Sequence, residues 1–235
     1  MSDHIVKSYD DDLAALKTML AQMGGLAEEQ LANAIDAIAR RDTQLADKVI
    51  AGDAKIDVFG RQIEEKAILT IAKRQPMARD LREIMVAIRV ASDLERIGDL
   101  AKNTAKRTHA ISEALPRKLI TGLARMGALA QEQLRTILDA YAHTDAEKAI
   151  AVWRSDEELD AIFNSIFREL LTYMMEDPRM IGLCTHLLFG AKNIERVGDH
   201  TTNIAENVYY LVHGRALTDD RPKGDDTSST LIRKE

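Results

Sequence analysis

Leu94-Glu-Arg-Ile-Gly-Asp-Leu-Ala-Lys-Asn-Thr-Ala105 returns one hundred positions later as Ile194-Glu-Arg-Val-Gly-Asp-His-Thr-Thr-Asn-Ile-Ala205, and this repetition decides the fold. Six of the twelve positions are identical. Two earlier pairs of segments also recur in the same order: Asp53-Ala-Lys-Ile-Asp57 with Asp156-Glu-Glu-Leu-Asp160, and Glu29-Gln-Leu with Glu132-Gln-Leu. Similarity that runs in order through three successive segments indicates an internal duplication.

Most of the chain has a composition and pattern typical of helices. Aromatic residues make up only 4% of the chain, it has four prolines, and Ala, Leu, Ile, Glu and Arg dominate, which favours helices over strands. Prolines 76, 116 and 178 disfavour helix in the residue before them and so mark ends. The pattern predicts six helices at about 8–40, 43–74, 77–113, 117–142, 145–175 and 179–213.

Long helices with short connections are typical of antiparallel neighbours in a bundle. We therefore predict an all-α fold of two tandem three-helix bundles that arose by duplication. The first repeat spans 1–115 and the second 116–214. Residues 215–235 are polar, and we expect them to form a disordered tail.

Charge and composition exclude several classes of protein. The net charge of −6 gives no basic footprint for nucleic acid. A single cysteine, Cys184, excludes an intrachain disulfide framework and fits a reducing compartment. The N-terminus lacks the pattern of a secretion signal, and no apolar run approaches the ~20 residues of a membrane span. We expect a cytoplasmic protein that reaches membranes only through partners.

Acidic residues in the third helix of each repeat continue its apolar stripe. Spacings of four place three polar side chains on one helical face within an arc of ~80°. They are Glu95, Asp99 and Asn103 in the first repeat, and Glu195, Asp199 and Asn203 in the second. Glu206 returns to the same face eleven residues after Glu195. This placement predicts carboxylates that lie partly inside the bundle.

The second helix of each repeat adds a further acidic pair beside its buried stripe: Asp53 with Asp57, and Asp156 with Asp160. If the second and third helices pack together, about four carboxylates share one groove, and like charges there are costly unless compensated. A multivalent cation is the simplest compensation, and oxygen ligands suit Mg²⁺, Mn²⁺ or iron. Salt bridges to Arg or Lys are the alternative, although Arg96 and Arg196 point ~100° away from the motif glutamates. We favour metal binding.

The two Glu-Arg-[Ile/Val]-Gly-Asp motifs resemble those of the PhoU family, which regulates phosphate-specific transport in bacteria. The similarity extends through Ile71-Ala-Lys-Arg-Gln-Pro76, Ala78-Arg-Asp-Leu81 and Leu170-Leu-Thr-Tyr-Met-Met-Glu-Asp177. This resemblance implies multinuclear metal clusters held by the motif acids and their second-helix partners. The ions implied are divalent or ferric: Mg, Mn, Fe or Zn.

The resemblance also implies a signalling function. Proteins of this kind relay the state of the PstSCAB phosphate transporter to the sensor kinase PhoR and repress the phosphate-starvation genes when phosphate is plentiful. The implied partners are PhoR and the transporter ATPase PstB, and we expect a homodimer.

Two other functions compete with this interpretation. One is a metal-dependent hydrolase acting on a phosphate compound, since clustered carboxylates with bound metal can activate water. The sequence offers no His or Lys repeated beside both motifs to act as acid or base, so we expect a protein that is not an enzyme. The other is a passive helical scaffold whose acids are only salt-bridged.

Overall fold

The computed structural model describes residues 2–111 and 116–218, and within that part of the chain it is entirely helical apart from turns and connections. Its elements are α1 (Ser2–Arg40), α2 (Thr43–Arg74), α3 (Arg79–Thr108), α4 (Arg117–His143), α5 (Ala146–Glu176), the 3₁₀ turn η1 (Pro178–Met180) and α6 (Ile181–His213). The predicted all-α fold of two tandem three-helix bundles is confirmed.

Local chemistry sets the helix ends, and the two repeats use the same device at equivalent places. Asp42 caps α2 by accepting a hydrogen bond from the Leu45 backbone N–H, and Asp145 caps α5 in the same way through Lys148, both at 2.9 Å. At the other end of α2, Gln75 adopts a left-handed conformation (φ 48°, ψ 53°), which stops the helix in front of Pro76.

Several predicted boundaries were wrong. The first helix begins at Ser2 rather than near residue 8. The third spans 79–108 rather than 77–113, because Ala78 has φ 51° and cannot continue a right-handed helix; residues 112–113 lie outside the described part. The sixth helix starts at Ile181 after the 3₁₀ turn. Of the predicted tail, 215–218 is described and non-helical, and 219–235 lies outside the described residues.

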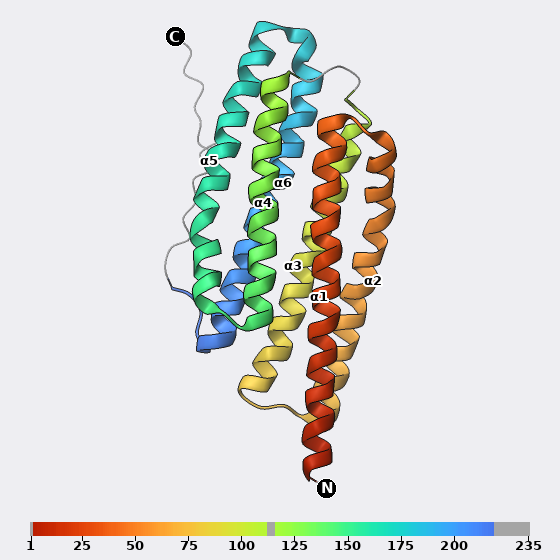
Figure 1. The fold of residues 1–235 in the computed structure, drawn as a ribbon, viewed down its shortest axis with the longest axis vertical. Helices are drawn as coiled ribbons and strands as arrows, with labels where there is room; N and C mark the ends of the chain where they lie inside the picture. Colours follow the sequence, from red (N-terminus) through yellow and green to blue (C-terminus); the bar gives the residue numbers. More distant parts are fainter. Residues whose placement is uncertain (1, 112–115, 219–235) are drawn as a thin grey trace.

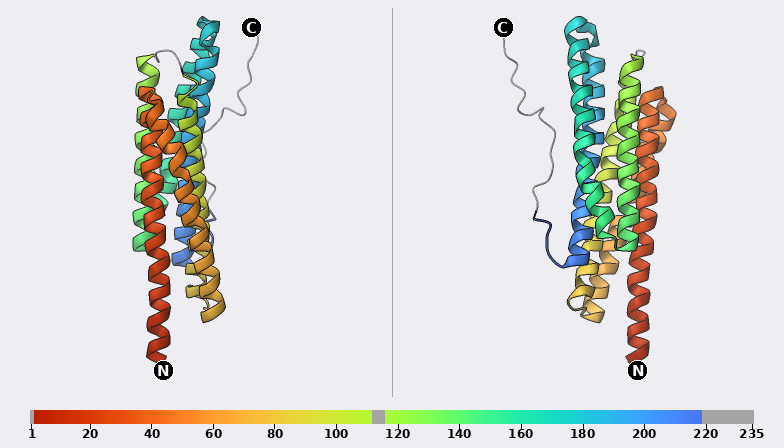
Figure 2. Two further views of the ribbon diagram at one scale, coloured as in Figure 1. Left: turned by 90° about the vertical axis from the view of Figure 1, so that its right-hand side faces the viewer. Right: turned by 60° about the vertical axis from the view of Figure 1, so that its left-hand side comes forward.

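The two repeats lie side by side with opposite directions (Figure 1). Within each repeat the three helices pack on one another, and between the repeats α3 packs against α6 and α1 against α4. Figures 1 and 2 show α1 and α3 running one way along the long axis while α4 and α6 run the other. Both contacts between the repeats are therefore antiparallel.

An approximate twofold axis relates the repeats, and glycines reveal it. A Cβ atom placed on Gly24 of α1 would lie 2.9 Å from Leu138 Cδ1 of α4, and one on Gly127 of α4 would lie 2.7 Å from Ile35 Cδ1 of α1. Gly127 is the repeat equivalent of Gly24, and Leu138 that of Ile35, since both pairs are 103 residues apart. The two contacts are therefore the same contact seen from either repeat. The absence of a side chain at these two positions lets α1 and α4 approach closely.

One continuous apolar core runs through both repeats. It includes buried side chains from all six helices, among them Met23, Ile56, Leu94, Met126, Phe163 and Ile194. None of the helices in the described ranges combines the length and apolarity that a membrane span requires. Because the core is shared, the predicted division into repeats 1–115 and 116–214 does not divide it. Whether residues 1–115 fold on their own stays a prediction.

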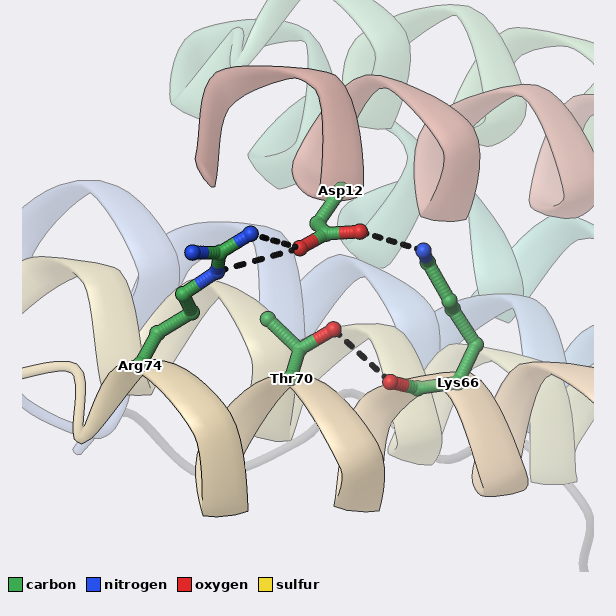
Figure 3. A network of polar contacts seen from close by, with 4 residues as sticks. All are labelled: Asp12, Lys66, Thr70 and Arg74. Atoms are coloured by element: carbon green, nitrogen blue, oxygen red, sulfur yellow. Dashed lines mark hydrogen bonds and ion pairs between the residues drawn. The ribbon is translucent and has the colours of Figure 1, made fainter. Parts of the chain in front are cut away.

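Charged side chains tie α1 to α2 at one end of the first repeat (Figure 3). Asp12 of α1 lies between Lys66 and Arg74 of α2 and accepts hydrogen bonds from both. The hydrogen bond from Lys66 is the main reason that the pKa of Asp12 falls below its usual value. The second repeat joins the equivalent helices with the signs reversed, through Lys118 of α4 and Glu169 of α5 at 3.3 Å.

Candidate functional site

The groove between α2 and α3 gathers the acids of the first repeat. Asp53 is only 3% exposed, whereas Asp57 is half-buried and Asp99 has 39% of its side chain exposed. A Cβ on Gly98 of α3 would lie 2.8 Å from Ile56 Cδ1 and 3.4 Å from Asp53 Oδ1. Gly98 therefore lets α2 come close enough to present the Asp53 carboxylate to the motif helix.

Lys102 occupies this groove. Its Nζ lies 2.5 Å from Asp53 Oδ2 and 4.0 Å from Asp99 Oδ1. The hydrogen bond to Asp53 raises the pKa of Lys102 above its usual value, and the charges of Asp53, Asp99 and Asp57 add to the effect. The other oxygen, Asp53 Oδ1, is buried and has no hydrogen-bond partner. Arg96 adds a second cation, since its Nη1 lies 3.5 Å from Asp99 Oδ2. The ammonium and guanidinium groups together still leave Asp53 Oδ1 without a partner.

A cavity of about 210 Å³ adjoins the groove at Glu95. Small residues open it, since Gly60 faces Glu95 from α2 and Ser92 precedes it on α3. A Cβ on Gly60 would lie 3.0 Å from Glu95 Oε2. The half-buried Glu95 carboxylate therefore has free space beside it.

The second repeat has the same groove floor with a different cover. A Cβ on Gly198 of α6 would lie 2.4 Å from Leu159 Cδ2 and 3.0 Å from Asp156 Oδ1, which mirrors the contacts of Gly98. Three of its acids are no more than 5% exposed: Asp156, Asp160 and Glu195. This groove is therefore more completely buried than its counterpart.

Lys192 and Phe163 cover Glu195. Lys192 Nζ lies 2.9 Å from Glu195 Oε1 and 5.0 Å from the centre of the Phe163 ring. Phe163 occupies the position that Gly60 holds in the first repeat, because the two are 103 residues apart. Burial raises the pKa of Glu195 to about 7, and the charges of Asp199 and Asp160 contribute, although Lys192 opposes the shift. Glu195 Oε2 is buried without a hydrogen-bond partner.

The remaining predicted site residues lie outside the two grooves or at their ends. Asn103 is exposed on α3. Asn203 Nδ2 lies 3.3 Å from Asp93 Oδ1 of α3, and His200 Nδ1 lies 2.9 Å from the same oxygen. Asn203 therefore contacts the other repeat. Glu206 accepts a hydrogen bond of 3.1 Å from Trp153 Nε1 of α5. The structure thus places the aspartates and glutamates of the two motifs in or beside their grooves, but not the amides.

Three residues that touch the grooves were not predicted from the sequence: Lys102, Lys192 and Gln133. Lys102 and Lys192 carried no repeat signal, because Thr202 and Ser92 stand at the equivalent positions. Gln133 of α4 is 3% exposed and donates from Nε2 to the Ser155 carbonyl oxygen at 3.0 Å.

The amide oxygen of Gln133 points toward the floor of the second groove. It lies 3.7 Å from the position of a Cβ on Gly198 and has no hydrogen-bond partner. The repeated Glu-Gln-Leu motif was the available signal for this residue, since Gln30 is its counterpart in the first repeat.

The oxygen atoms of the two grooves suit a hard cation. Asp53 Oδ1, Gln133 Oε1 and Glu195 Oε2 are buried acceptors without a donor, and such oxygens are commonly satisfied by an ion or a water molecule. Carboxylate and amide oxygens are the ligands that Mg²⁺ and Mn²⁺ prefer. In the described ranges, however, no three His, Cys, Asp or Glu side chains are grouped so that they could hold a metal ion as they stand. The residues fit such an ion by chemistry, and their side chains need to rearrange to hold it.

Known proteins resemble the chain over nearly its whole length. The sequence profile of the PhoU domain matches residues 20–108 and 123–208, one copy of the motif in each. The phosphate-specific transport system accessory protein PhoU homolog of Rhizobium meliloti (strain 1021) is 56% identical over 97% of this chain and 96% of its own. The homolog of Caulobacter vibrioides (strain NA1000 / CB15N) is 53% identical over 96% of this chain and 98% of its own.

Two solved structures share the fold. The crystal structure of PhoU from Pseudomonas aeruginosa has a TM-score of 0.85 and 37% identity, covering 88% of this chain and 100% of that one. The phosphate transport system regulatory protein PhoU from Streptococcus pneumoniae has a TM-score of 0.83 and 29% identity, covering 89% and 99%. All four proteins are named as accessory or regulatory proteins or simply as PhoU.

Proposed function

The chain belongs to the PhoU family, and on this premise we propose that it is a cytoplasmic, non-enzymatic negative regulator of phosphate uptake and of the phosphate-starvation response. The observation that carries the proposal is the 56% identity, over 97% of the chain, to an accessory protein of phosphate-specific transport. The acidic grooves explain how such a regulator is held in shape.

In this proposal both grooves bind divalent or ferric ions, with Mg²⁺, Mn²⁺, iron and Zn²⁺ as the candidates. Asp53, Asp57, Glu95 and Asp99 hold the ions of the first repeat, and Asp156, Asp160, Glu195 and Asp199 those of the second. The ions supply positive charge that offsets the repulsion among these carboxylates. The protein's own side chains fix the spacing of α2 from α3 and of α5 from α6.

The partners in this proposal are PhoR and the transporter ATPase PstB, and the protein acts as a homodimer that connects them. An adaptor of this kind must present a surface of defined shape to each partner. The grooves contribute to that shape, because each lies between two packed helices, α2 with α3 in the first repeat and α5 with α6 in the second. A passive scaffold lacks this dependence on metal.

Replacing two acids of the second groove tests the proposal. In a strain that carries only the Glu195→Ala, Asp199→Ala variant, we expect alkaline phosphatase to be made even in rich phosphate, because the groove between α5 and α6 loses two of its ligands. Alkaline phosphatase activity and the amount of the protein are measured together.

Two further variants make the result interpretable. Glu195→Gln with Asp199→Asn removes the charges while preserving side-chain shape, and it should give the same loss of repression. Glu157→Ala with Glu158→Ala removes two exposed acids of the same repeat and should leave repression intact. Normal repression by both groove variants at wild-type protein levels would refute a role for the grooves in signalling.

A further inference from the structure

Each acidic groove contains one lysine, and the two lysines come from opposite sides of the repeated motif. Lys102 lies three residues after Asp99, whereas Lys192 lies three residues before Glu195. Their equivalents in the other repeat are uncharged: Thr202 and Ser92. Two copies of one groove have thus acquired an ammonium group at different positions.

We propose that Lys102 and Lys192 are built-in counter-ions that occupy the grooves in the metal-free protein, and that a divalent cation enters each groove by displacing the lysine. The inference rests on the proposed function, since it concerns the regulation of the same metal sites. It explains why the acids of the two repeats lie together without forming a finished coordination sphere.

The geometry of the first groove supports an exchange of this kind. Lys102 Nζ contacts Asp53 Oδ2 and leaves the buried Asp53 Oδ1 without a partner. A cation of charge +2 at the same distance attracts each carboxylate twice as strongly as an ammonium does. Lys102 also has a way out, because 28% of its side chain is exposed and its four-carbon stem is flexible. The free space beside Glu95 lets that carboxylate turn toward an incoming ion.

The second groove resists the exchange more strongly. Lys192 must give up its ion pair with Glu195 and its position over the Phe163 ring together. The negative face of an aromatic ring attracts a cation, so this contact adds to the cost of moving Lys192. Phe163 is buried and closes the space that Gly60 leaves open in the first repeat. Metal therefore fills the first groove before the second.

Calorimetric titration of the chelator-treated full chain with Mn²⁺ tests the inference. We expect Lys102→Met to bind Mn²⁺ in the first groove about tenfold more tightly than the wild type, because the competing ammonium is gone. The same variant should melt at a lower temperature than the wild type without metal and recover when Mn²⁺ is added. If Lys102 had only a structural role, its removal would lower the stability of the metal-free protein without tightening Mn²⁺ binding.

Two variants control for charge and position. Lys106→Met removes an exposed lysine one turn further along α3 and should change neither quantity. Lys102→Arg keeps a competing cation and should show no gain in affinity. If it gains as much as Lys102→Met, the effect is due to the side-chain stem and the displacement is refuted. Should Lys102→Met fail to fold, Lys192→Met provides the same test in the second groove.

The outcomes separate the inference from the proposed function. Wild-type binding with unchanged affinity in Lys102→Met and Lys192→Met overturns the displacement and leaves the metal site standing. No Mn²⁺ binding by any of the proteins overturns both the displacement and the metal part of the proposed function. The regulatory role itself is tested separately by the repression of alkaline phosphatase.

Discussion

The two grooves share their floor and differ at their rim. In both, a motif glycine faces an apolar side chain and an aspartate of the preceding helix, and these contacts recur at equivalent positions. At the rim, a small residue in one repeat is replaced by a large or charged one in the other. The pairs are Gly60 with Phe163, Ser92 with Lys192, and Thr202 with Lys102. After the duplication the acids and their support were kept while the access to them diverged.

The difference at the rim has an electrostatic consequence. Glu95 is half-buried beside a cavity, whereas Glu195 is 5% exposed under Lys192 and Phe163. A carboxylate removed from water favours its neutral form. The motif glutamate therefore has a different environment in each repeat. A property measured for Glu95 cannot be transferred to Glu195.

The largest expected contrast lies between Phe163 and Gly60. Phe163→Ala should lower the free energy of unfolding by about 3–5 kcal/mol, because it empties a buried site. Gly60→Ala should stay within ~1 kcal/mol of the wild type, since the new Cβ meets only the flexible ends of the Glu95 and Met23 side chains and replaces a helical glycine. Urea-induced unfolding of both variants measures the contrast. Equal effects would mean that Phe163 does not close the second groove.

A smaller contrast is expected in the pH dependence of the metal-free protein. The pKa of Glu195 rises from 4.5 to about 7 on folding, so the folded protein holds a proton that the unfolded chain releases near pH 4.5. This contribution to stability is fully present below pH 4.5 and is lost as the pH rises to about 7. Its size is on the order of 3 kcal/mol at most.

Thermal melts between pH 4 and 8 measure that loss. Glu195→Gln should abolish this part of the decline, and the exposed Glu157→Gln is the matched control variant from the same repeat. A decline of unchanged size in Glu195→Gln would contradict the burial of this carboxylate in the second groove.

The smallest contrast concerns the ion pairs of reversed sign that join the first two helices of each repeat. Asp12→Asn should destabilise the protein by ~1 kcal/mol, since it leaves two partly buried cations with a weaker acceptor. Glu169→Gln should cost less than about 0.5 kcal/mol, because Lys118 is 78% exposed and its pair is screened by water. Chemical unfolding curves compare the two, and a larger cost for Glu169→Gln would reverse this ranking.

Repetition and periodicity made much of this architecture predictable. The second helix was placed at 43–74, as observed, because Asp42 caps it and Pro76 follows it. The grouping of Asp53 with the motif helix was also foreseeable, since the second and third helices both carry apolar stripes that must face each other. These signals are local, and each occurs twice.

Features set by tertiary contacts between helices could not be predicted. The helical wheel placed Glu206 on the face of Glu195, and it does face α5, but ~16 Å further along the helix axis, where Trp153 stands in place of an acid. Asn203 turns to Asp93 of the other repeat, a partner 110 residues away. The lysines occur once each, and the reach of a long flexible side chain depends on its tertiary surroundings.

The antiparallel contact of α1 with α4 also bears on how the chain is made. The α4 positions that meet Gly24 and Ile35 are synthesised about a hundred residues after their α1 counterparts, which at ~5–20 residues per second takes on the order of 5 to 20 s. During that interval the α1 surface of a nascent chain is uncovered. The α4 of a neighbouring chain on the same messenger RNA can then compete for it, so we expect exchange of whole repeats between chains as a misassembly of this fold.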